Sequence, residues 1–212
     1  MFKDFLKFAM IGLLLVVVEI LLVSSMIRQS WILDNIQEEN RMNEHYFGSE
    51  TAGHIRSRAK EVYVSLFVDT GIQDSTYHML LPREDLDSSL DLSTVASPVF
   101  DHVRRSLGTF WATVYQVLTR LQVWIMWVPA ALLLIIPAVV DGLMMRRVKV
   151  DAHITTSSIR MKYALLTIFV SLFVLLLSLF SPFAVNPVLY MVLSMLCIIM
   201  VSVLLANVQK DI

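Results

Sequence analysis

The sequence has no excess of charge of either sign and almost no cysteine. Its formal net charge is −1, whereas a nucleic-acid-binding protein needs a basic face, so we expect no direct contact with DNA or RNA. Its one cysteine, Cys197, lies inside an apolar stretch and excludes a disulfide within the chain.

Motifs that mark common catalytic and metal sites are also missing. The sequence contains no P-loop, no G-x-S-x-G and no H-E-x-x-H, and its five histidines lack metal-ligand spacing. We therefore expect no enzymatic activity, no cofactor and no metal. No internal repeat is evident either, so the pattern of an inverted-repeat transporter is absent.

Apolar residues, in contrast, are abundant and concentrated in blocks. Hydrophobic residues make up 57% of the chain, and the mean hydropathy is +0.68. Four stretches, residues 8–27, 121–140, 163–180 and 188–208, are long enough to span a membrane, and Glu19 alone interrupts the first with a charge. The sequence predicts an all-α integral membrane protein with four transmembrane helices. We expect the first to be an uncleaved anchor, the alternative being a cleaved signal peptide.

The distribution of charge predicts the orientation. Residues 141–162 hold five basic side chains against two acidic ones, whereas residues 28–120 hold thirteen acidic against nine basic ones. The positive-inside bias places the short basic loop in the cytoplasm. Both termini, including the tail 209–212, are then cytoplasmic, and residues 28–120 form a helical extension on the opposite side of the membrane.

Within the extension, local signals predict three helices and one loop. The helical pattern of the first membrane segment continues past Ile27 to about Tyr46, and Gly48 then ends it. Thr51 is predicted to cap a second helix over residues 52–67. Residues 69–97 are rich in Asp and Ser without periodicity, which predicts a flexible loop. The step from Ser97 to Pro98 then predicts a helix start.

The helix after Pro98 carries apolar residues that advance by four and three positions, as in a heptad seam. The seam consists of Val103, Leu107, Phe110, Val114, Val117, Leu121 and Trp124. A helix that rises above the membrane needs a partner for such a seam. We expect residues 28–46 to pair with it in antiparallel fashion; a second copy of the chain or a different protein are the alternatives.

Two residues of the first membrane helix are candidates for buried contacts. Glu19 falls near the middle of the bilayer, where a carboxylate costs roughly 2.5–3.5 kcal/mol, so it is expected to face protein. Gly12 shares its face and permits close helix packing. A hydrogen bond from Glu19 to Ser171, Ser178 or Ser194 is the expected role, and a proton relay is the alternative.

The stretch "VVDGLMMRRVKVD" closes the second apolar segment with charge. Asp141 and Gly142 are expected where the helix leaves the hydrocarbon, and Arg146, Arg147 and Lys149 follow them. The need to set the orientation of the chain in the membrane is sufficient to explain these charges. A second, compatible interpretation makes Asp141 and the three basic residues a docking site for a partner.

In the C-terminal half, an apolar helix ends in a V-D-G-L-x-x-R run, and a Ser-Ser pair precedes the next membrane helix. Those residues are Val140, Asp141, Gly142, Leu143, Arg146, Ser157 and Ser158. By this pattern, residues 120–212 resemble a family of membrane proteins encoded by integrating conjugative elements and conjugative plasmids. One departure is Lys162, where the family pattern has a histidine four residues after the serine pair.

The resemblance implies a role in DNA transfer between bacteria, next to a type IV secretion apparatus and its coupling-protein ATPase. It also implies a bacterial inner membrane, with residues 28–120 as a periplasmic helical extension. The leading hypothesis is a non-enzymatic accessory protein that contacts this machinery through Arg146, Arg147 and the apolar seam, alone or as a homo-oligomer. An entry-exclusion protein acting in the recipient is one alternative. A small proton-coupled transporter is another, and only Glu19 supports it.

Overall fold

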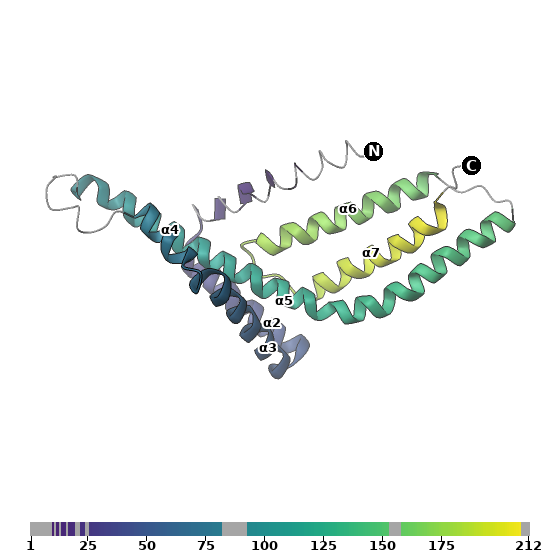
Figure 1. The fold of residues 1–212 in the computed structure, drawn as a ribbon, viewed down its shortest axis with the longest axis horizontal. Coiled ribbons are helices and arrows are strands. Elements are labelled where there is room, and N and C mark those ends of the chain that lie inside the picture. The colour runs from purple at the N-terminus through teal and green to yellow at the C-terminus, as the bar shows by residue number, and fades with distance from the viewer. Residues whose placement is uncertain are drawn as a thin grey trace. The chain divides into compact units, whose positions relative to one another are not determined.

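The computed structural model describes residues 10, 12, 14–15, 17–19, 22–23, 26–81, 93–152 and 158–208, with the backbone alone for 93–99. The described chain is helical and contains no strand. Its helices are α2 (Gln29–Phe47), α3 (Ser49–Tyr63), the π-helix η1 (Val64–Val68), α4 (Ile72–Leu80), α5 (Ser93–Asp151), α6 (Ser158–Phe180) and α7 (Val188–Asn207). Figure 1 shows their order along the chain.

The chain divides into two compact units. The first unit comprises residues 1–122 together with 179–185, and the second comprises residues 123–178 together with 186–212. The α6–α7 turn thus belongs to the first unit, although both of its helices belong almost entirely to the second.

In the first unit, α2 runs in the same direction as α5. Thr109 of α5 donates a hydrogen bond to the Ile27 carbonyl at 3.3 Å, and Arg120, further along α5, bonds to Glu39, further along α2. The expected antiparallel pairing is therefore wrong. The reason lies at Arg28, whose extended backbone (φ −75°, ψ 142°) interrupts the helix, so that α2 begins anew instead of extending the preceding segment.

The α2–α3 pair turns at Gly48, as expected, but the second helix starts earlier than Thr51. Gly48 has φ +81°, which glycine adopts without a Cβ penalty, and α3 begins at the next residue, Ser49. The two helices are tied by an ion pair in which Arg56 Nη2 lies 2.8 Å from Glu44 Oε1. Ala52, Ile55 and Ala59 form the buried face of α3.

The segment expected to be a loop, residues 69–97, is helical in part. The short helix α4 occupies Ile72–Leu80 after Gly71 (φ +70°), and α5 already begins at Ser93, ahead of Pro98. Pro98 therefore lies in the second turn of α5, where its missing N–H removes one main-chain hydrogen bond, to the carbonyl of residue 94. Residues 82–92 lie outside the described part of the chain.

α5 also ends later than the sequence predicts. The helix continues without interruption through Asp141 and Gly142 to Asp151, so that the first part of the expected cytoplasmic loop is helical. Pro129 and Pro137 both lie within this helix. Membrane helices tolerate proline where neighbouring groups satisfy the carbonyls that it leaves without an N–H partner.

Three helices are apolar and long enough to cross a membrane, and the second unit contains most of α6, all of α7 and the part of α5 that follows residue 122. The candidate spans are Phe100–Asp151, Ser158–Phe180 and Val188–Asn207. Contacts from Trp124 to Ser194 and from Asp141 to Ser202 show that α5 and α7 run in the same direction; α6 returns between them in sequence (Figure 1).

Large apolar side chains on all three of these helices are exposed, among them Leu133, Ile136, Val170 and Ile199. Such surfaces are stable in hydrocarbon and costly in water, so the three helices indicate a membrane protein. The fourth expected span, residues 8–27, is described only at scattered positions, and it is not among the candidate spans found in the described residues.

Candidate functional site

The most buried face of the first part of α5 is polar. Thr109, Thr113, Gln116 and Arg120 follow one another at helical spacing, and each is at most 4% exposed. Each threonine hydroxyl donates to the carbonyl four residues earlier, so the hydroxyls are satisfied within α5 itself. This face packs against α2, where Ile32 and Ile36 contribute an apolar cluster with Ala112 and Tyr115 of α5 as partly buried neighbours.

At the end of this face, Arg120 forms a buried ion pair with Glu39. The guanidinium donates to Glu39 Oε1 from Nε at 3.0 Å and from Nη2 at 2.5 Å, and the two side chains are 2% and 5% exposed. The same carboxylate oxygen accepts from Gln116 Nε2 at 3.1 Å. Charge-assisted hydrogen bonds of this kind are among the strongest in proteins, and burial removes the screening of bulk water.

Arg120 also binds the end of α6 and the turn that follows it. Its Nη1 donates to the carbonyls of Leu179 and Ser181 at 2.9 and 2.7 Å, and its Nη2 donates to that of Phe183 at 2.6 Å. The last carbonyls of a helix have no partner within it, and a cation at this end is favoured by the helix dipole. Arg120 therefore caps α6 with a side chain from α5.

α2 holds the same turn from its own side. Trp31 Nε1 and Asn35 Nδ2 both donate to the Pro182 carbonyl, at 3.2 and 2.7 Å, and Glu39 accepts from the Val185 N–H at 3.0 Å. These three residues of α2 are spaced by four and therefore lie along one face of the helix. We call Glu39, Arg120 and the bound turn, residues 179–185, the turn clamp.

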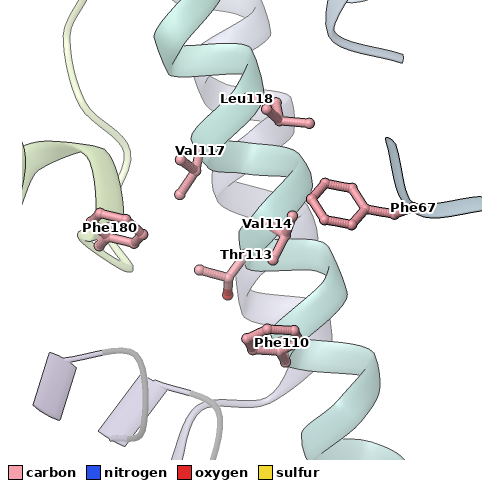
Figure 2. Close-up of a pocket in the computed structure, with 7 residues that line it drawn as sticks. All are labelled: Phe67, Phe110, Thr113, Val114, Val117, Leu118 and Phe180. Carbon is pink, nitrogen blue, oxygen red and sulfur yellow. The ribbon is translucent and has the colours of Figure 1, made fainter. Parts of the chain in front are cut away.

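An apolar hollow lies beside the turn clamp. It has a volume of about 190 Å³, and its lining residues are Phe67, Phe110, Thr113, Val114, Val117, Leu118 and Phe180. Figure 2 shows five of these residues on α5 as the floor, with Phe67 and Phe180 on opposite sides of it. Among the described residues, no charged side chain lines the hollow.

Phe67, which forms one wall of the hollow, belongs to a cluster of aromatic rings. Phe67 lies 5.4 Å from Trp111 and 5.7 Å from Tyr63, measured between ring centroids, and Tyr63 lies 5.8 Å from Tyr115. Phe67 is carried by η1, and such π-helical turns occur often at functional sites. Trp111 Nε1 is buried and has no hydrogen-bond partner among the described residues.

The predicted seam is thus divided between two environments. Leu107 is buried and Val103 is half-buried, while Phe110, Val114 and Val117 line the hollow. The seam does not form the main interface with α2, which is the polar face instead. The 4–3 spacing indicates where α5 carries apolar side chains, but α2 packs on the neighbouring stripe.

The charged residues predicted as a docking site are also divided. Asp141 Oδ2 accepts from the Ser202 hydroxyl at 3.1 Å, and Lys149 Nζ donates to the Ala206 carbonyl and to Asn207 Oδ1 at 3.0 and 2.9 Å. Lys149 therefore caps α7 much as Arg120 caps α6. Arg147 is exposed and Arg146 is half-buried, so these two remain the candidates for contacts outside the chain.

The two candidates in the first apolar segment are only partly described. Gly12 is buried and Glu19 is half-buried, and Glu19 lies within the electrostatic influence of Arg120. Glu19 Oε2 is buried and accepts no hydrogen bond from any described residue. The expected hydroxyl partner for Glu19 stays a prediction. Across the described residues, no three His, Cys, Asp or Glu side chains approach closely enough to hold a metal ion.

The turn clamp was not predicted from the sequence. In the sequence, Arg120 is one of nine basic residues within 28–120, and Glu39 is one of two adjacent glutamates on a hydrophilic helix. One signal was available: Arg120 is the last charge before twenty uncharged residues, and it lies between Val117 and Trp124 of the seam. An arginine in that position must find partners as its helix enters the membrane.

Comparison with known protein families identifies the group to which this chain belongs. A model of IncC plasmid conjugative DNA transfer proteins, described as DtrJ-like, matches residues 27–210. The chain belongs to the DtrJ-like family. The match confirms the resemblance to proteins of conjugative elements, and it includes the turn clamp, the hollow and the three candidate spans. No curated protein and no solved structure matches the chain significantly.

Proposed function

We propose that the chain is a non-enzymatic accessory component of conjugative DNA transfer in the inner membrane, associated with type IV secretion, that acts through protein contacts. The observation that carries this proposal is the hollow on α5, an uncharged apolar surface lined by seam residues. Membership of the DtrJ-like family supports the process, and the three apolar helices support the membrane location.

In this proposal the chain crosses the membrane four times. Residues 1–27 supply a cytoplasmic tip and the first span, 121–140 the second, and 163–208 a hairpin of two. Residues 28–120, with the hollow, face the periplasm, while 141–162 and the tail 209–212 face the cytoplasm. The basic composition of 141–162 supports this orientation.

The outward contact uses the hollow as the receptor for one large apolar side chain on a helix of the transfer machinery. A volume of about 190 Å³ is below that of sites for drug-sized ligands, roughly 300–1,000 Å³. It suits an aromatic or aliphatic anchor of the kind that dominates protein interfaces. The seam spacing along the floor favours a helical partner, which presents such anchors at intervals of three or four residues.

The inward contact uses Arg146 and Arg147, and we propose the coupling-protein ATPase as the partner. Reversing both charges should reduce co-purification of that partner. Because the same charges help to set orientation, the topology of the variant must be verified with reporters on each side of the membrane. A complex of normal yield in the correct orientation would exclude this surface as the docking site.

Mating assays test the proposal directly. The gene is deleted, and the mutant is used first as donor and then as recipient, with wild-type protein or the Val114→Trp variant supplied in trans. The larger side chain fills the hollow, so donor transfer should fall at least about tenfold, the loss expected when one anchor of roughly 1.4 kcal/mol or more is excluded. His102→Trp, at an exposed position of the same helix, is the matched control.

Normal donor transfer by the deletion mutant would refute a role in the sending apparatus. If the deleted recipient then accepted redundant DNA, the entry-exclusion function would replace the proposed one, with the hollow facing the incoming machinery. Normal transfer with Val114→Trp, at unchanged protein levels, would instead refute the hollow as the contact.

A further inference from the structure

Phe180 forms one wall of the hollow, and the two carbonyls that flank it in the sequence are both bound by Arg120. The Leu179 carbonyl lies 2.9 Å from Arg120 Nη1, and the Ser181 carbonyl lies 2.7 Å from the same nitrogen. A single guanidinium nitrogen thus fixes the backbone on either side of Phe180. The phenyl ring faces the floor of the hollow, as Figure 2 shows.

The floor of the hollow is attached to the same arginine. Val117 and Leu118 line it, and both lie within one helical turn of Arg120 on α5. The guanidinium therefore connects the helix that carries the floor to the turn that carries the wall. No lining residue other than Phe180 comes from the 179–185 segment.

We propose that Arg120 is a positioning residue for the docking hollow: paired with Glu39, it holds Phe180 in place, so that the wall exists only while the turn clamp is closed. The proposal rests on the proposed function of the hollow and concerns its regulation. Opening the clamp removes the wall and leaves a flatter surface that no longer encloses the anchor of a partner.

Glu39 keeps the clamp closed. Its Oε1 accepts from two guanidinium nitrogens of Arg120 and also from the Val185 N–H, which lies at the far end of the same turn. Without the carboxylate, the buried guanidinium would lose its ion-pair partner Glu39, and removal of one partner of a buried pair is strongly unfavourable. The pair therefore acts as a unit, and the loss of either partner should release Phe180.

The first experiment measures the mobility of residue 180 and does not depend on transfer. In full-length protein, Cys197→Ser removes the native thiol and Phe180→Cys introduces a reporter, whose reaction with a maleimide is timed in membranes. Arg120→Lys keeps the charge but loses the planar fork, which lets Nη1 bind both carbonyls while Nε and Nη2 bind Glu39. It should accelerate labelling about tenfold, as expected for loss of one or two charge-assisted hydrogen bonds.

Arg105→Lys is the matched control, because Arg105 lies on the same helix, is exposed, and bonds only to the carbonyl of Asp101 in its own helix among the bonds described. Equal labelling rates for Arg120→Lys and Arg105→Lys would overturn the inference. If Arg120→Lys does not accumulate, Glu39→Gln replaces it, since this isosteric change removes the negative charge that holds the guanidinium.

The second experiment uses mating and separates this inference from the proposed function. Both hold if Val114→Trp and Arg120→Lys, in the otherwise native chain, each reduce transfer. If Val114→Trp blocks transfer and Arg120→Lys does not, the hollow is a contact site but the clamp does not govern it. If Val114→Trp has no effect, the proposed contact fails, and the labelling rate alone decides whether Arg120 positions Phe180.

Discussion

Gly142 of α5 lies directly against the backbone of Ser202 in α7. A Cβ atom placed on Gly142 would be 2.7 Å from the Ser202 carbonyl oxygen and 2.9 Å from Leu205 Cβ. The glycine of the V-D-G-L run therefore permits a close helix approach, and the adjacent Asp141 bonds to the Ser202 hydroxyl from the same position. Small residues at helix contacts serve this purpose in membrane proteins.

Gly142→Ala should weaken the packing of α5 on α7. The added methyl group meets backbone that cannot move alone, so the helices must separate, and overpacking of this kind costs about 1–3 kcal/mol. Thermal unfolding in detergent measures the effect. Gly53→Ala is the control: it lies inside α3 with nothing within 4 Å of its added Cβ, so it should stabilise the protein by about 0.5–1 kcal/mol. Equal effects at both sites would contradict the close approach at Gly142.

Lys149→Met should destabilise the end of α7, because the Lys149 ammonium binds the Ala206 carbonyl and the Asn207 side chain. The loss should be about 1 kcal/mol, typical of a cation at a helix C-terminus. Arg147→Met removes an equal charge from an exposed position of the same helix and should change stability by less than about 0.5 kcal/mol. Hydrogen exchange at residues 203–207 provides the measurement. Faster exchange in Arg147→Met than in Lys149→Met would refute the cap.

The Glu39–Arg120 pair should show strong coupling in a double-mutant cycle. Glu39→Leu or Arg120→Met alone leaves a buried charge without its partner and should cost about 3–5 kcal/mol. The combined variant removes both charges and should be more stable than the sum of the single losses predicts. Unfolding free energies of the four proteins give the coupling energy. Simple additivity would mean that the two side chains do not depend on each other.

The first unit should lose stability in strongly alkaline solution. Burial and the neighbouring Tyr77 raise the pKa of Tyr63 above its ordinary value of 10.0, so the folded state retains the phenol proton longer than the unfolded state does. The stabilisation that the protonated phenol gives to the folded state is complete below about pH 10. It is lost as pH rises through the higher folded pKa. Tyr63→Phe removes the titrating hydroxyl and its hydrogen bond to Gln73, so the free energy of unfolding of this variant should fall less steeply as pH rises. An equally steep decline in that variant would assign the effect to other groups.

The membrane helices could be predicted because their signal is local. A run of about twenty apolar residues is recognisable without knowledge of its neighbours, and the three described spans agree with the sequence in position within a few residues, apart from the extension of α5 at both ends. Gly48 was equally predictable as the end of a helix, because its positive φ favours glycine.

The direction of α2 could not be predicted, because neither glycine nor proline marks the break at Arg28 and the apolar periodicity runs through it. The turn clamp could not be predicted from the sequence for a different reason. Its partners, Glu39 and Arg120, are 81 residues apart, and each is a residue type that usually faces solvent.

The polar face of α5 has a consequence for how sequences in this family can diverge. Thr113 donates to the Thr109 carbonyl of its own helix, so an apolar residue of similar size leaves no group on α2 without its partner, whereas Thr109 also donates to the Ile27 carbonyl that precedes α2. Glu39 and Arg120 have no such freedom, since each satisfies the other. Family members can therefore vary at the position of Thr113 by single substitutions, whereas the charged pair can be lost or exchanged only through joint substitution.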